Sequence, residues 1–331
     1  MLAFMIVSMF TLQGCKSSPS TDKGDEQQNG EKKEKTIKIG YLPIVDHLPL
    51  MVASGDKRFQ GFKVEAIKFS DWPTLTESLK SGSIDGAHML NSLAVKMVSD
   101  GFEAQAVLLS HRGGLALTTN DSINEVNDFK GKKIGVPSRF SPHYMHLHNY
   151  LTKNEIDVEK DVKIIDAAPP ELVSMLAAGT IDAYIVAEPF PTLAEVKGVG
   201  KTFKLWDEIV IEGTNGLDCV VVFNKKMIQN DAEIVQGYVS TLVETGKYIE
   251  EKPMEAAKLA SPFMLNLEPE TIVRSIDEPK NRCTYDNLRL EKNEFQKFYD
   301  YMIKIKLIEK EVDMDEFIND TFANKAYEVS N

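Results

Sequence analysis

Cysteine is scarce in this chain of 331 residues, which holds only Cys15, Cys219 and Cys283. So few thiols exclude a disulfide-dense miniature scaffold and a cysteine-rich zinc module. Basic residues are outnumbered, because 38 Lys and Arg face 50 Asp and Glu and leave a formal net charge of −12. Nucleic-acid binding needs a basic face, so we expect no nucleic-acid partner. A small anionic ligand is still compatible with this charge, since a pocket can differ in sign from the surface around it.

Long hydrophobic runs and familiar catalytic motifs are also missing. After Cys15 no apolar run approaches 18 residues, so we expect no later segment to span a bilayer. The sequence has no Gly-Lys-Thr phosphate loop, no His-Glu-x-x-His and no nucleophile elbow. Its hydrophobic share of 43% and charged share of 27% are ordinary for a globular protein. The length suggests about two domains.

The N-terminus has the features of a targeting segment. Residues 1–12 are apolar and uncharged, and Leu12-Gln13-Gly14-Cys15 follows. The run has the length of a signal-peptide core, and the four residues resemble the lipobox of bacterial lipoproteins. We therefore expect a signal peptide over 1–14, then a lipidated Cys15 and a flexible tether over 15–35, which is polar throughout. No positive charge precedes Cys15, so we expect further residues upstream. A buried N-terminal strand is the alternative.

The body of the chain alternates strand and helix patterns. Alternation of apolar and polar residues predicts strands over 37–42 and 63–69, and a helix over 72–80 ends near Gly82. A short strand is expected over 84–87. This order is typical of a parallel sheet covered by helices.

One phrase occurs twice. Leu79 to Ala87 and Leu176 to Tyr184 share the skeleton Leu-x-x-Gly-x-Ile-Asp, which fits a helix end, a glycine cap and a buried strand. Gly131 to Pro137 likewise parallels the opening strand. We expect two α/β lobes of similar plan, and the alternative is a generic helix–strand joint that arises twice.

Two apolar, β-rich segments, 114–119 and 218–223, are candidates for strands that cross between the lobes. They predict a two-strand hinge, with the first lobe over 36–119 plus 221–331 and the second over 120–220. Most of 225–331 shows helical spacing, clearest at 235–248, 254–259 and 294–304. A cleft between two lobes is a common place for a small ligand.

Several short motifs together resemble one family over about residues 36–225. They are similar to the nitrate/sulfonate/bicarbonate (and taurine) branch of ABC-transporter substrate-binding lipoproteins, which have the type II periplasmic-binding-protein fold, an α/β fold with two mixed or parallel sheets flanked by helices. The motifs are Ile39-Gly40-Tyr41-Leu42-Pro43-Ile44-x-Asp46, Ser70-x-Trp72-x-Thr74-Leu75, Gly86-Ala87-His88-Met89-Leu90, Gly131-Lys132-Lys133-Ile134-Gly135-Val136-Pro137, Ser141-Pro142-His143 and Glu188-Pro189-Phe190.

This resemblance implies a transport receptor and no enzyme. The protein would be a monomer, lipid-anchored at the outer face of the cytoplasmic membrane. It would capture a small oxoanion (nitrate, bicarbonate or a sulfonate) and deliver it to a permease driven by an ATPase, with no cofactor beyond a divalent cation that can accompany the ligand. Three alternatives stay open: a receptor for a pyrimidine or other aromatic precursor, a sensor that presents its ligand to a membrane receptor, and an enzyme of pyrimidine or quinone synthesis, which the lipobox disfavours.

Histidines supply the first candidate site residues. His47, His88 and His143 follow predicted strands or open a predicted helix, and ligands of α/β sheets bind at the carboxyl ends of strands. His143 is the strongest candidate, because Ser141-Pro142 begins a helix whose first backbone N–H groups attract anions. The resemblance points to the same place, where nitrate and bicarbonate binders carry Ser-Met-His. Local capping or packing is the alternative for each ring, and a metal pair of His143 with His146 is less favoured.

The other candidates are polar or aromatic liners of the cleft. Trp72 could wall the pocket or fill the core, and Asp46 and Asn91 would line the first lobe. Glu188 could accept a proton, hold a cation or pair across the lobes. Asn215, Gly216 and Asp218 could add contacts before the second crossing. Cys219 and Cys283 are either a disulfide or two buried thiols.

Overall fold

The structure is a computed structural model that describes residues 34–329. The expected signal peptide over 1–14, Cys15 and the tether as far as residue 33 lie outside the described residues. None of the helices within 34–329 combines the length and the apolar character that a membrane crossing requires.

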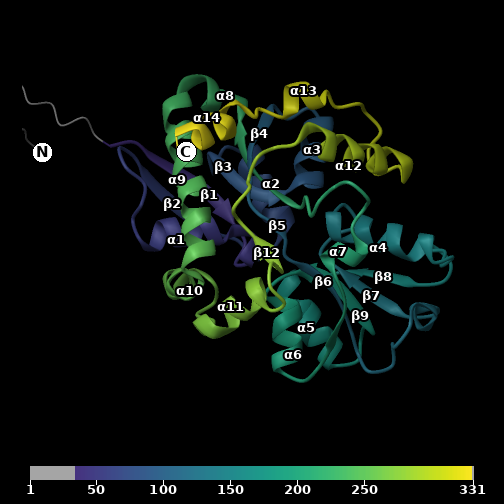
Figure 1. Cartoon of the computed structure of the whole chain (residues 1–331). Helices are drawn as coiled ribbons and strands as arrows, with labels where there is room; N and C mark the ends of the chain where they lie inside the picture. Colours follow the sequence, from purple (N-terminus) through teal and green to yellow (C-terminus); the bar gives the residue numbers. More distant parts are fainter. Residues whose placement is uncertain (1–33, 330–331) are drawn as a thin grey trace, which may run out of the picture. The chain divides into compact units, whose positions relative to one another are not determined.

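Five strands form the first sheet in the order β2-β1-β3-β11-β4 (Figure 1). Strand β1 is parallel to β2 and β3, whereas β11 is antiparallel to both of its neighbours. This sheet and the helices that connect its strands are called the first lobe. Its elements are β1 (Thr36–Tyr41), α1 (Leu48–Gly55), β2 (Lys63–Lys68), α2 (Trp72–Lys80), β3 (Gly86–Leu90), α3 (Asn91–Ser99), β4 (Ala104–Leu109) and β11 (Cys219–Asn224).

A second sheet of five strands has the order β10-β6-β9-β7-β8. Strand β7 is parallel to β8 and β9, and β6 is antiparallel to β9 and β10. This sheet and its helices are called the second lobe. Its elements are β6 (Leu115–Thr119), β7 (Lys133–Val136), α4 (Pro142–Lys153), β8 (Lys163–Asp166), α5 (Pro169–Ala177), β9 (Ala183–Ala187), α6 (Phe190–Val196), β10 (Lys201–Leu205) and α7 (Trp206–Ile209). Two mixed sheets flanked by helices are the α/β architecture that the sequence predicts.

The repeated phrase makes the same joint in both lobes. In each, a helix (α2 or α5) is followed by a glycine with positive φ and then by a central strand (β3 or β9). The carboxylate of Asp85 accepts the backbone N–H of Lys38 in β1 at 2.7 Å. The carboxylate of Asp182 accepts that of Lys133 in β7 at 2.9 Å. The aspartate of each phrase therefore fastens the helix–strand joint to the first strand of its own sheet.

The chain crosses between the sheets at different points from those expected. Strand β6, expected in the first lobe, pairs within the second sheet, and β11 already begins at Cys219 in the first. The crossings are the loops around 110–114 and 210–218. Gly113 and Gly114 both have φ of +75°, a conformation that glycine adopts without strain. The N–H of Gly113 donates to the carbonyl of Gly216 at 3.1 Å, so the two crossing segments are hydrogen-bonded to each other.

Strand β3 also lies later than the sequence suggests, at Gly86–Leu90 instead of 84–87. Ile84 and Asp85 belong to the preceding turn, where Asp85 is held by Lys38. His88 consequently lies inside a strand instead of beyond one.

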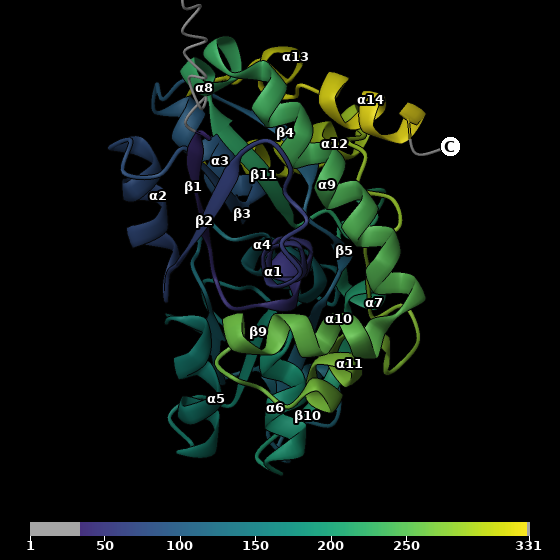
Figure 2. The same cartoon turned by 90° about the vertical axis from the view of Figure 1, so that its left-hand side faces the viewer.

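The C-terminal part is helical, as predicted. Helix α9 packs against α1 and α14, while α13 and α14 contact β4 (Figure 2). Helix α11 contacts α6 of the second lobe, and the Arg274 guanidinium lies 3.1 Å from the Glu195 carboxylate there. These elements are α8 (Lys225–Asn230), α9 (Ala232–Glu251), α10 (Pro253–Ala260), α11 (Pro269–Asp277), α12 (Lys292–Lys304), α13 (Met314–Phe317) and α14 (Thr321–Val329), with a two-stranded sheet of β5 (Arg112–Gly113) and β12 (Cys283–Thr284).

Candidate functional site

The two lobes contact each other where their strands lead into helices. Just after β1, the N–H of Val45 donates to the carbonyl of Glu188, which follows β9, at 3.0 Å. The hydroxyl of Ser92 in α3 donates to the carbonyl of Phe140, just before α4, at 2.5 Å. The ligand-binding edge expected from the α/β plan is therefore the edge at which the lobes meet.

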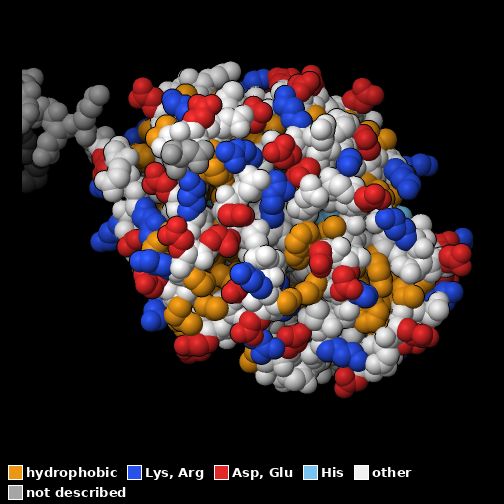
Figure 3. All heavy atoms as spheres, viewed as in Figure 1, with side chains coloured by type: hydrophobic (Ala, Val, Ile, Leu, Met, Phe, Trp, Pro, Cys, Tyr) orange, Lys and Arg blue, Asp and Glu red, His pale blue; other side chains and the backbone are white. Residues whose placement is uncertain are grey.

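All eight predicted site residues are buried, and they come from both lobes. Five of the six histidines are buried too, so that Figure 3 shows little histidine on its face of the molecule. The predicted residues are Asp46, His47, Trp72, His88, Asn91, Ser141, His143 and Glu188.

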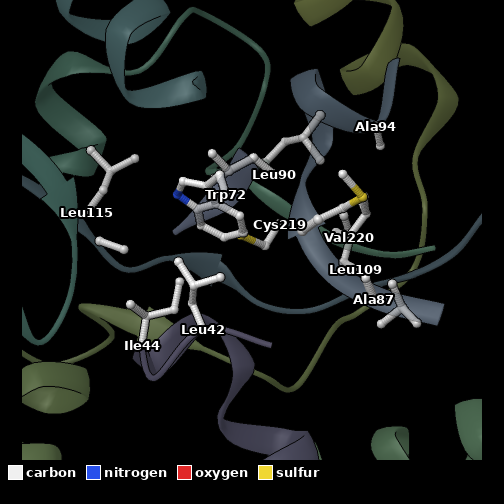
Figure 4. Packing of buried hydrophobic residues seen from close by; sticks show 14 of the residues in the cluster. Leu42, Ile44, Trp72, Ala87, Leu90, Ala94, Leu109, Leu115, Cys219 and Val220 are labelled. Atoms are coloured by element: carbon white, nitrogen blue, oxygen red, sulfur yellow. The ribbon is translucent and has the colours of Figure 1, made fainter. Parts of the chain in front are cut away.

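Three of these residues form an aromatic group in the first lobe. The ring of His47 meets that of Trp72 edge-on with centroids 5.9 Å apart, and that of His88 at 5.2 Å. Trp72 opens helix α2 instead of lying on a loop before it, because Asp71 is the N-cap and accepts the N–H of Thr74. Figure 4 shows its indole nitrogen turned toward Leu115 of β6, in the second lobe. Trp72 is thus both a core residue and one that faces the other lobe.

A group of buried polar atoms has no hydrogen-bond partner. Buried polar groups in proteins are nearly always paired, and an unpaired one costs about 1–3 kcal/mol. Several unpaired atoms close to the contact between the lobes therefore suggest a ligand site. They are His47 Nε2, Trp72 Nε1, Asn91 Nδ2, both ring nitrogens of His143, both carboxylate oxygens of Asp218 and Asp46 Oδ1.

His88 and Ser141 differ from the other candidates because their polar atoms are already satisfied. The Nε2 atom of His88 lies 2.8 Å from the hydroxyl of Tyr238, and its Nδ1 lies 2.9 Å from that of Ser110. The hydroxyl of Ser141 caps helix α4 by accepting the N–H of Tyr144 at 3.1 Å. These contacts give both residues a structural role, and their contact with a ligand stays a prediction.

His143 and Asp218 face each other across the lobes, with Nε2 and Oδ2 3.3 Å apart. Burial lowers the pKa of His143 to about 3, helped by the nearby His146 and His111. Burial, together with the charge of Asp46, raises the pKa of Asp218 well above its usual range. A neutral imidazole and a carboxyl that can keep its proton are good hydrogen-bonding groups for a polar ligand, and neither brings a full charge into the site.

Asp46, His111 and Cys219 form a second polar group beside this pair. His111 Nε2 lies 3.3 Å from Asp46 Oδ2, and the Cys219 thiol lies 3.5 Å from the same oxygen. Burial alone would lower the pKa of His111, but the charge and hydrogen bond of Asp46 raise it. Cys219 and Cys283 are both free thiols, which decides between the two expectations for them. Burial raises the pKa of each thiol well above its usual range.

Glu188 forms an ion pair with Arg282, and both are buried. The guanidinium also donates to the carbonyl of Glu278 at 2.8 Å. Burial raises the pKa of Glu188 to about 7, although Arg282 opposes the shift. The structure pairs Glu188 with Arg282 of the C-terminal part. Its expected roles of pairing across the lobes, accepting a proton and holding a cation stay predictions.

His111 and Arg282 are the residues that the sequence reasoning did not single out. His111 directly follows the apolar run of β4 and precedes Gly113 and Gly114, so a histidine at a strand end before two glycines was the available signal. Arg282 lies far along the chain from Glu188, and no local pattern links the two.

Two lobes, two crossings and a buried polar group where the lobes meet define the class of two-lobed, periplasmic-type binding proteins. The NMT1-like family model matches residues 30–263, and the chain belongs to this family. A putative aliphatic sulfonates-binding protein of Bacillus subtilis is 25% identical and is matched over 99% of this chain and 96% of its own length. The nitrate/nitrite binding protein NrtA of a Nostoc species is 27% identical over 49% of this chain, and the match spans only 43% of that protein.

Solved structures agree on the fold. The ligand-binding component of an ABC-type import system from Staphylococcus aureus, solved with zinc bound, superposes with a TM-score of 0.80 and 25% identity over 88% of this chain and 99% of that one. The periplasmic nitrate-binding protein NrtA from Synechocystis gives a TM-score of 0.79 at 17% identity, over 90% of this chain and 89% of that one. The type II periplasmic-binding-protein fold is thus established for this chain, and its relatives and structural neighbours are substrate-binding proteins of ABC importers.

Proposed function

We propose that this chain is the extracytoplasmic substrate-binding component of an ABC importer and that it captures a small oxoanion between its two lobes. The observation that carries the proposal is the set of unpaired buried donors drawn from both lobes. Trp72 Nε1 and Asn91 Nδ2 belong to the first lobe, and the single N–H of the neutral His143 ring belongs to the second. One small anion with several oxygens can accept hydrogen bonds from all three, and would then favour the state in which the lobes contact each other.

The charges near these donors are compatible with an anion. The raised pKa of Asp218 lets its carboxyl hold a proton, and Arg282 balances Glu188. Nitrate, bicarbonate and sulfonates are the proposed ligand classes. The names of the Bacillus and Nostoc relatives, which refer to aliphatic sulfonates and to nitrate or nitrite, support that choice. No catalytic step is part of the proposal.

The proposed partners are a membrane permease and its ATPase. A lipid on Cys15 would hold the monomeric protein at the outer face of the cytoplasmic membrane. Mass spectrometry of the protein extracted from membranes tests the anchor, because a diacylglyceryl group on Cys15 adds a defined mass and a C15S variant cannot carry it. Unmodified Cys15 in the membrane-extracted protein would contradict the anchor.

Thermal unfolding of the full chain tests the ligand class. Nitrate, bicarbonate with and without calcium, taurine, alkanesulfonates and pyrimidines are added in turn. A ligand at 100 times its dissociation constant stabilises the folded state by about 2.7 kcal/mol, which moves the unfolding temperature by several degrees. We expect a shift with an oxoanion, its loss in His143→Ala, and its retention in His148→Ala. His148 is the matched control, because it lies on the same helix with its Nδ1 2.9 Å from the hydroxyl of Tyr301.

Any other outcome would count against an oxoanion as the ligand of the proposed site. A shift with pyrimidines alone would support the receptor for an aromatic precursor, for which the group of Trp72 and His47 could provide stacking. A response to an oxoanion that survives His143→Ala would refute the proposed site. No shift with any compound would contradict the proposed ligand class.

A further inference from the structure

We propose that Asp46, His111 and Cys219 form a binding site for one metal ion of the zinc class. The site goes beyond the capture of an oxoanion and does not depend on it. All three residues are fully buried, and one ligand atom from each lies within 4.8 Å of the other two. A carboxylate, an imidazole and a thiolate are three of the side chains that bind Zn²⁺ in proteins. They come from three separate segments: the turn after β1, the first crossing and the start of β11.

The contact between His111 and Asp46 has a geometry that suits a bound cation. The Nδ1 atom of His111 lies 3.6 Å from the Cys283 thiol, on the opposite side of the ring from Asp46. When Nδ1 carries the proton of the neutral ring, Nε2 presents a lone pair toward Asp46 Oδ2 at 3.3 Å. Two lone pairs at this distance need a proton or a metal ion to hold them together. Asp46 Oδ1 has no hydrogen-bond partner either.

Cys283 and Tyr285 form an outer layer that orients His111. The thiol of Cys283 donates to the hydroxyl of Tyr285 at 3.2 Å, and this hydroxyl donates to the carbonyl of Val45 at 2.8 Å. The chain of bonds places an acceptor, the Cys283 sulfur, opposite Nδ1–H of His111. The Nε2 atom then keeps its lone pair, which accepts the backbone N–H of Cys219 at 3.4 Å and which a metal ion would take over. Metal-binding histidines are commonly oriented in this way through their second nitrogen. Cys283 is therefore assigned a positioning role, and Cys219 supplies the metal–sulfur bond.

A further carboxyl lies close to the three ligands. The side chain of Asp218 is buried and would bind the metal ion through an oxygen once it loses its proton. Neither of its oxygens has a hydrogen-bond partner, and it precedes the ligand Cys219 in the chain. Binding of M²⁺ would displace the thiol proton of Cys219 and any proton shared by His111 and Asp46, and both would leave to solvent. Three protein ligands leave a fourth tetrahedral position for Asp218 or for an exogenous ligand.

The site is closely packed around Gly114 and lies near a hollow of the surface. Gly114 has φ of +75°, and a Cβ there would lie 3.0 Å from Cys283 Sγ and 3.3 Å from both Asp46 Oδ1 and His111 Nδ1. Because Gly114 has no side chain, Asp46, His111 and Cys283 can lie this close together. Cys283 and Tyr285 also line a surface hollow with Glu250 and Asp277, so the outer side of the His111 ring lies one side chain from solvent.

Cobalt substitution tests the proposal, because Co²⁺ replaces Zn²⁺ and its thiolate complexes show an intense charge-transfer band in the near ultraviolet. The band does not arise at surface sites made only of carboxylates and imidazoles. The full chain, without a histidine tag, is titrated with Co²⁺ and then with Zn²⁺ or Ca²⁺. We expect a band that saturates at one Co²⁺ per chain, that Zn²⁺ removes and that Ca²⁺ leaves, since a thiolate site disfavours a hard cation. No band, or a band that Ca²⁺ removes, would overturn the proposal.

Three cysteine variants identify which thiol binds the metal ion. C15S changes a thiol outside the described residues and should give the same band as the unchanged chain. C219S should lose the band. C283S should keep the band but bind Co²⁺ about 10–100 times more weakly, as is usual for residues that orient a ligand. A band that survives C219S, or one lost in C15S, would refute the assignment. Circular dichroism shows whether each variant is folded. If a variant does not fold, the Co²⁺ titration of the unchanged chain still tests whether the metal site exists.

Discussion

The buried ion pair of Glu188 and Arg282 allows a quantitative test of how the structure is held together, because the two partners differ in how they can lose their charge. Arg282 is 3% exposed and stays charged at any ordinary pH, so Glu188→Gln leaves a buried, unpaired cation. We expect this variant to lose about 3–5 kcal/mol of unfolding free energy.

Arg282→Met leaves the other partner, which can become neutral by taking a proton. Burial already raises the pKa of Glu188 to about 7 with Arg282 in place, and the variant removes a charge that lowers it. Because the folded state then holds the proton more tightly than the unfolded state, the stability of the variant is greatest at low pH and falls as pH rises through the folded-state pKa. The cost of Arg282→Met should therefore be about 1 kcal/mol near pH 5.5 and several kcal/mol near pH 8.5.

Urea unfolding followed by tryptophan fluorescence measures both variants and the double variant. Trp72 lies in the first lobe and Trp206 in the second, so the signal reports on both. The double variant should be more stable than Glu188→Gln, since it leaves no unpaired charge. Costs that add in the double variant, or a cost of Arg282→Met that does not change with pH, would refute the reasoning.

Three other predictions follow from single positions. Gly114→Ala should lose about 1–3 kcal/mol more in urea unfolding than Gly131→Ala, because both have positive φ but a Cβ at Gly131 meets nothing within 4 Å; equal losses would contradict the crowding at Gly114. Cys219 and Cys283 should react with a thiol reagent only after unfolding, since both are buried with raised pKa values; rapid reaction of the folded C15S variant would count against this. Trp72→Phe should change stability by less than about 2 kcal/mol because Nε1 has no partner, yet weaken oxoanion binding; an unchanged affinity would remove Trp72 from the site.

Much of the fold could be predicted because its signals are local. The helix at Trp72–Lys80 follows from the Asp71 cap, Pro73 and the periodic apolar residues, and the structure has it at the expected bounds. The repeated phrase predicts the same joint in both lobes, since a glycine with positive φ ends the helix within one turn of chain. The contact of each aspartate with the first strand of its sheet is not local and was not predicted. The sheet to which a strand belongs is not local information. Gly114–Thr119 was therefore recognised as a strand but assigned to the wrong side of the crossing.

The candidate site shows the same division. Strand ends and helix starts pointed to His47, His88 and His143, because topology places such positions at one edge of a sheet, although His88 lies inside β3. Which of the histidines already has partners depends on distant residues, as with Tyr238 beside His88. The partner of Glu188 likewise lies in a segment more than ninety residues further along the chain, at Arg282, so no spacing rule could reveal it.

A crystal structure of the full chain, grown with the oxoanion that shifts its unfolding temperature most, would show whether both lobes hold the ligand. We predict an anion with oxygens about 2.7–3.2 Å from Trp72 Nε1, Asn91 Nδ2 and a ring nitrogen of His143. An anion bound elsewhere, or bound to one lobe alone, would contradict the proposed site between the lobes.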